Sequence, residues 1–156
     1  MVAIIGSYKY AIKVIGPRVV LNGEIVTRRQ IQCFTAGALI MWIASDWPMH
    51  DIAEEYLYSV HMLQHMMLSY FVPSLILLSI PKWLFDAVFG SGRGYRAIKF
   101  LSRAPVAGLL FNVMVMVAHI PDVVNRSVSN GPLHYSLHIL LIVTSLLMWM
   151  PVCGPE

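Results

Sequence analysis

The sequence predicts an all-α integral membrane protein, a bundle of four transmembrane helices with both termini in the cytoplasm. Of its 156 residues, 58% are hydrophobic and only 12% are charged. A soluble domain of this length could not bury so much apolar surface, so lipid is its expected solvent. Ten of the eleven lysines and arginines fall in two stretches, 9–29 and 82–103. This clustering is typical of basic cytoplasmic loops and argues against a nucleic-acid partner.

The N-terminal part of the chain divides into a basic segment and a first span. Residues 1–30 are expected to form a basic cytoplasmic segment, with turns at Gly16-Pro17 and Asn22-Gly23. The transmembrane domain covers residues 31–153, and its first span is expected at 31–47. At ~1.5 Å of rise per residue, this stretch is barely long enough to cross the hydrocarbon.

The second and third spans are separated by a basic loop. Residues 46–55 form an acidic loop without lysine or arginine, and the second span follows at 56–80, with a kink expected at Pro73. A loop over 82–104 leads to the third span at 105–120, because a proline at position 105 suits the start of a helix.

The fourth span sets the topology. A short loop over 121–132 leads to a span at 133–150, closed by Pro151. Short loops join antiparallel neighbours, so an up-down bundle is expected in the cell membrane. The two outer loops, 46–55 and 121–132, together hold five acidic residues and one basic residue, so they are expected to face the periplasmic or extracellular side.

Five of the six histidines are expected to gather near that outer face. They are His61 and His65 in the second span, His119 at the end of the third, and His134 and His138 at the start of the fourth. Residues four apart share one face of a helix, so each His-x-x-x-His pair can grip one metal ion. Polar residues inside a membrane are expected to line the bundle interior and to mark functional sites.

Other residues near this slab are candidates for supporting roles. Asn112 falls beneath His119 on the third span, and Ser145 falls beneath the histidines of the fourth. Four further residues are candidates for metal access or for positions beside the ligands: Met49, His50, Met62 and Met66.

The chemistry of the site leaves several alternatives open. Imidazole suits copper, zinc, iron and nickel, and the ten methionines favour copper, because thioethers bind Cu(I). Zinc remains possible, as does haem held between facing helices. In a purely structural membrane subunit, the same histidines would only be hydrogen-bonded. A metalloprotease is disfavoured, because Met62 and Tyr135 stand where its glutamate would be, so no enzyme is predicted.

Several blocks resemble the multi-spanning CtaG family of cytochrome c oxidase assembly factors. They are Ala44-Ser45-Asp46-Trp47-Pro48-Met49-His50-Asp51, His61-Met62-Leu63-Gln64-His65-Met66-Met67-Leu68, Val72-Pro73, Ala118-His119-Ile120-Pro121, Leu133-His134-Tyr135-Ser136-Leu137-His138 and Trp149-Met150-Pro151-Val152. The His-Met-x-x-His block followed by a late His-x-Pro is the most specific part.

The resemblance implies a role in building or supporting a haem-copper oxidase, with oxidase subunits as partners and copper as cargo. His61, His65, His119, His134 and His138 match the family pattern residue by residue. The chain departs from the pattern in having fewer spans than most members and in carrying Ala118 where tryptophan is commoner. A reduced relative that serves as a fixed subunit of a membrane complex is therefore a second reading.

Overall fold

The computed structural model describes residues 2–21, 24–45, 58–90 and 92–154. Within these ranges every regular element is a helix and no strand occurs, which confirms the all-α class. The elements are α1 (Val2–Tyr10), the π-helix η1 (Ala11–Ile15), α2 (Gly16–Val19), α3 (Arg28–Ser45), α5 (Tyr58–Met66), the π-helix η2 (Met67–Phe71), α6 (Val72–Ser79), α7 (Lys82–Phe89), α8 (Arg93–Leu101), α9 (Ala104–Ala118), α10 (Pro121–Ser129) and α11 (Gly131–Cys153).

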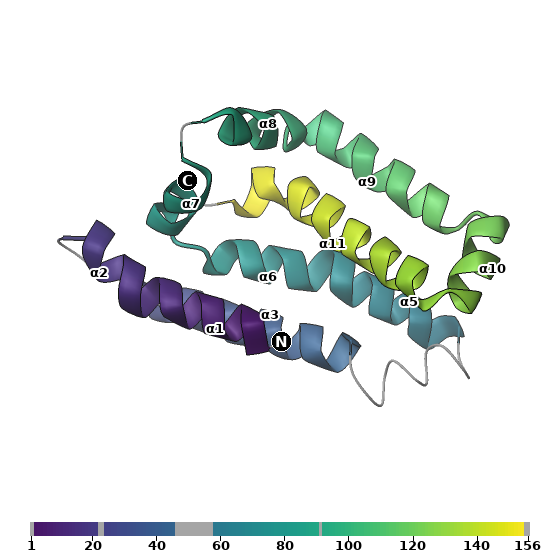
Figure 1. The fold of residues 1–156 in the computed structure, drawn as a ribbon, viewed down its shortest axis with the longest axis horizontal. Coiled ribbons are helices and arrows are strands. Elements are labelled where there is room, and N and C mark those ends of the chain that lie inside the picture. Colours follow the sequence, from purple (N-terminus) through teal and green to yellow (C-terminus); the bar gives the residue numbers. More distant parts are fainter. Residues whose placement is uncertain (1, 22–23, 46–57, 91, 155–156) are drawn as a thin grey trace.

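Four long helical segments form the body of the protein (Figure 1). The continuous segment of α5, η2 and α6 packs against α3 on one side and against α11 on the other, and α9 packs on α11. The core contains Ala44, Leu68 and Val72, with Ile142 of α11 packed against them. Gly37 allows α3 and α6 to approach closely, because a Cβ atom added there would lie 3.2 Å from the Leu75 Cβ.

The N-terminal segment is helical and lies along α3 (Figure 1). The turn expected at Gly16-Pro17 is wrong, since both residues belong to α2. Pro17 lies inside one continuous helix, directly after the π-turn η1, where it removes one main-chain hydrogen bond. The Tyr8 hydroxyl donates to the Ser79 carbonyl at 2.9 Å and ties this segment to the end of α6. The turn expected at Asn22-Gly23 lies outside the described residues.

The second span departs from a regular α-helix just before Pro73. A π-helical turn, η2, joins α5 to α6, and Pro73 stands in the first turn of α6. Proline has no N–H to offer the carbonyl four residues earlier, which here belongs to Ser69. The Trp149 indole Nε1 of α11 donates to that carbonyl at 3.1 Å. A π-turn supported by a neighbouring helix therefore stands directly before Pro73, and the kink predicted there stays a prediction.

Within the described parts of the chain, two helical stretches are long and apolar enough to cross a membrane, Ser59–Ser79 and Gly131–Cys153. A third would be formed by Gly94–Leu101 with Ala104–Ala118, two helices bent by 76° at a short break. Residues 31–45 of the predicted first span lie in α3, which is not among the helices long and apolar enough to cross a membrane, and residues 46–47 lie outside the described ranges. The first turns of α3 are polar, with Arg28, Arg29 and Gln30. A helical membrane protein is thus supported, while the four spans and the cytoplasmic termini stay predictions.

Three segments differ from expectation. The stretch 82–104, predicted to be a loop, contains α7 and α8, and Gly90 at the end of α7 adopts a positive φ, 54°. The stretch 121–132 contains α10, which Pro121 opens. α11 continues through Pro151 to Cys153, so the proline does not close it. In each case, residues that often punctuate structure lie at helix starts or within a helix.

Candidate functional site

The structure brings five histidine rings together at the end of the bundle where α10 lies (Figure 1). The His65 ring centroid lies 4.5 Å from that of His61, 4.8 Å from that of His138 and 6.3 Å from that of His119. The His134 ring centroid lies 4.5 Å from that of His138 and 6.0 Å from that of His61. We call these five residues the histidine cluster.

Chain direction and helix starts explain this placement. α5 and α11 both begin at this end, so each His-x-x-x-His pair occupies early turns of its helix. Asn130 caps α11 by accepting a hydrogen bond from the Leu133 N–H at 3.2 Å, which fixes the turn that carries His134. α9 arrives from the opposite end and stops at His119, because the nearby Pro121 disfavours further helix.

His61 and His65 lie in hydrogen-bonding contact, with their Nε2 atoms 2.9 Å apart. One of these nitrogens must donate and the other accept, so at most one of the two rings carries a positive charge. Both rings are partly buried. Nitrogens of two ligands on one tetrahedral metal lie roughly 3.3 Å apart, given metal–nitrogen bonds of about 2.0–2.1 Å. The observed spacing is close to that value.

His119 has its ring orientation fixed by its own helix. Its Nδ1 lies 2.7 Å from the Val115 carbonyl oxygen, so Nδ1 carries the hydrogen and donates it. The tautomer leaves the Nε2 lone pair for another partner. Metal-binding histidines are typically oriented in this way, with the second ring nitrogen bonded to a carbonyl or carboxylate.

The described residues nevertheless contain no group of three or more histidine, cysteine, aspartate or glutamate side chains arranged to hold one metal ion. The donor set therefore fits a transition metal by ligand type and by proximity, but its nitrogens do not already converge on a common point. Metal binding by the histidine cluster stays a prediction.

The supporting residues predicted from the sequence lie at different places. Asn112 is exposed and its amide donates to the Gly108 carbonyl at 2.7 Å, within its own helix. Ser145 is fully buried. Met62 is partly buried in α5, whereas Met66 is 55% exposed. The two residues of the outer loop, Met49 and His50, lie outside the described residues.

Gln64 is a further polar residue of this region, and its side chain joins two helices. It is 2% exposed, and its Nε2 donates to the Ala44 carbonyl near the end of α3. The last carbonyls of a helix lack partners within the helix, so this bond ties α5 to α3. A glutamine between two histidines in an apolar span is the signal that points to it.

Comparison with known proteins identifies the chain. A family model for the cytochrome c oxidase caa3 assembly factor, Caa3_CtaG, matches residues 8–156. The chain belongs to the Caa3_CtaG family. Neither the curated proteins nor the solved structures give a match. The resemblance drawn from the sequence blocks is therefore confirmed, and membership in Caa3_CtaG supports a role in assembling a cytochrome c oxidase.

Proposed function

We propose that this Caa3_CtaG protein handles copper for an oxidase under assembly, holding the ion with a subset of the histidine cluster. The observation that carries the proposal is the meeting of five imidazole rings from α5, α9 and α11, with neighbouring centroids 4.5–6.3 Å apart. Polar side chains are rare in membrane-spanning helices because burying them there costs free energy. A cluster of five histidines therefore favours a functional site.

Three rings are the best candidates for the resting ligand set. His61 and His65 already lie with their Nε2 atoms 2.9 Å apart, and His138 has its ring centroid 4.8 Å from that of His65. Rotation of these side chains about their own bonds would turn the nitrogens toward one ion. A site that has to be completed by rotation holds its cargo less tightly than a preformed one, which suits transfer to a client protein.

His119 is suited to exchange the ion with a partner. It is exposed and stands at the end of α9. Its ring centroid lies 6.3 Å from that of His65. Because its Nδ1 donates to the Val115 carbonyl, its Nε2 keeps a lone pair and is the ring nitrogen that can bind a metal. We propose that His119 binds copper on its way in or out, and that no substrate is chemically converted.

The proposed topology places the histidine cluster on the outer side. We propose four spans with both termini in the cytoplasm, supported by the basic stretches 9–29 and 82–103 and by the acidic outer loops. Copper would then arrive from the periplasmic or extracellular side, and the partners would be membrane-embedded oxidase subunits. A reporter that functions only in the cytoplasm should be active when it is fused after Glu156. Activity of a reporter that functions only on the outer side, fused at the same place, would overturn this orientation.

Metal analysis of the purified full chain tests the copper proposal. After loading with Cu(I) and removal of unbound ion, the unaltered chain should retain about one copper per chain, and the H61A/H65A variant should retain far less. Leu63→Ala changes the same helix at an exposed position and should leave the copper content unchanged. Equal copper in all three proteins would remove the histidine pair from the site. A haem absorption band in the purified protein would instead favour a b-type cytochrome.

A further inference from the structure

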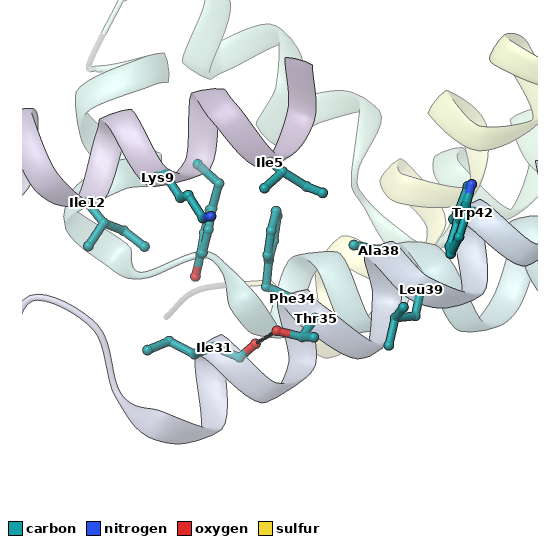
Figure 2. Close-up of a pocket in the computed structure, with 10 residues that line it drawn as sticks. Ile5, Lys9, Ile12, Ile31, Phe34, Thr35, Ala38, Leu39 and Trp42 are labelled. Carbon is teal, nitrogen blue, oxygen red and sulfur yellow. Dashed lines mark hydrogen bonds between the residues drawn. The ribbon is translucent and has the colours of Figure 1, made fainter. Parts of the chain in front are cut away.

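A groove lies between the N-terminal helix and α3, away from the histidine cluster (Figure 2). Its volume is about 650 Å³. Ile5 and Ile12 line it from one helix, and Phe34, Leu39 and Trp42 line it from the other. The stacked rings of Tyr8 and Phe34, with centroids 3.8 Å apart, hold the two helices together at its base. Pockets for drug-sized ligands typically have volumes of about 300–1,000 Å³.

The hydroxyls that line the groove are already used within the protein. Tyr8 donates to the Ser79 carbonyl, and Thr35 donates to the Ile31 carbonyl at 2.8 Å within α3. Leu39 and Trp42 are each about half exposed along its open side, 49% and 52%. The groove therefore offers an apolar channel to a flexible hydrocarbon chain.

One positively charged side chain, that of Lys9, lines this apolar groove. Lys9 extends from α1 into the space between the helices (Figure 2). Among the residues that the structure describes, no carboxylate forms an ion pair with it. The neighbouring helix is also basic at its start, since Arg28 and Arg29 begin α3. A ligand that matches this site must combine an apolar chain with an anionic group.

We propose that the groove binds one acyl chain of an anionic phospholipid, with the lipid phosphate paired to Lys9. Basic segments at membrane surfaces attract anionic lipids, and lysine side chains reach along apolar surface to the headgroup region. A helix from a partner protein fits less well, because it would bury Lys9 unless it carried a matching carboxylate. The bound lipid would stabilise the packing of the N-terminal helix on α3.

Lipid binding to the full chain in nanodiscs tests this proposal. Discs of equal parts phosphatidylglycerol and phosphatidylcholine are used, and the lipids that remain bound are counted by native mass spectrometry. The unaltered chain should retain phosphatidylglycerol in preference to phosphatidylcholine. Lys9→Gln should lower that preference about fivefold, the effect of one basic residue near an anionic surface. Lys13→Gln, which changes an exposed lysine outside the groove, is the matched control and should retain the preference.

A second variant distinguishes lipid binding inside the groove from general attraction of anionic lipid to the basic surface. Thr35→Phe fills the groove without a change of charge and should lower the retention of both lipids; Leu39→Trp fills it from an exposed position if Thr35→Phe does not fold. An equal loss of preference in the two lysine variants would mean diffuse attraction and would overturn the proposal. Unchanged lipid retention in the folded filled variant would overturn it as well.

Discussion

The indole Nε1 of Trp149 donates a hydrogen bond to the main-chain carbonyl of Ser69 across the interface of α11 and η2, at 3.1 Å. Ser69 lies four residues before Pro73, which has no N–H to offer it. Its hydroxyl also donates to the His65 carbonyl at 2.6 Å. The π-turn that follows the His61–His65 pair is thus fastened to the helix that carries His134 and His138.

Trp149→Phe should destabilise the protein by about 0.6–1.7 kcal/mol, the range found for hydrogen bonds between membrane helices. Phenylalanine keeps an aromatic ring beside Tyr70, whose centroid lies 6.2 Å from that of Trp149, but removes the donor and part of the indole. Reversible unfolding in detergent measures the difference. In a Pro73→Ala background the same substitution should cost less, because residue 73 then has an N–H for the Ser69 carbonyl. An equal cost in both backgrounds would refute the coupling.

Gly37→Leu should destabilise the bundle by about 1–3 kcal/mol, as overpacking does in cores. A Cβ atom at Gly37 already meets the Leu75 Cβ at 3.2 Å, so a larger side chain must push α3 away from α6. Gly108→Leu in α9 is the matched control, because a Cβ atom there meets nothing within 4 Å. The free energies of unfolding of the two variants should differ clearly, and equal values would contradict the close packing of α3 on α6.

Ser145→Ala should leave stability unchanged or raise it by up to about 1 kcal/mol, because a buried hydroxyl without a hydrogen bond is costly. Ser145 is fully buried, and its Oγ has no hydrogen-bond partner among the described residues. Ser79→Ala is the contrast, since that equally buried hydroxyl donates to the Ile76 carbonyl at 2.6 Å. A larger loss for Ser145→Ala than for Ser79→Ala would show that the Ser145 hydroxyl has a partner.

The helical class and the positions of the long helices could be predicted from hydropathy and from prolines at helix starts. The short helices that connect them could not be predicted in this way. Glycines around position 92 and the polar residues of 121–132 suggested loops, yet α8 and α10 form there as short helices. Gly16-Pro17 misled in the same way, because the pair lies inside a continuous helix, directly after the π-turn η1. Sequence patterns of this kind mark a change of element without telling which element follows.

The histidine cluster was predictable because it depends only on helix direction and depth. α5 and α11 start at one end of the bundle and α9 finishes there, which brings His61, His119 and His134 to one level. Side-chain partners were not predictable. Asn112 turns back to its own helix at Gly108, and Gln64 crosses to Ala44, choices set by packing between helices.

X-ray absorption of the copper-loaded chain tests the central claim most directly. The account predicts a first coordination shell with at least two imidazole nitrogens at about 2.0 Å, the distance typical of histidine ligands. The imidazole signal should disappear together with copper retention in the H61A/H65A variant and should persist in Leu63→Ala. A copper shell made of sulfur alone, or an imidazole signal unchanged in the double variant, would contradict the assignment of copper to the histidine cluster.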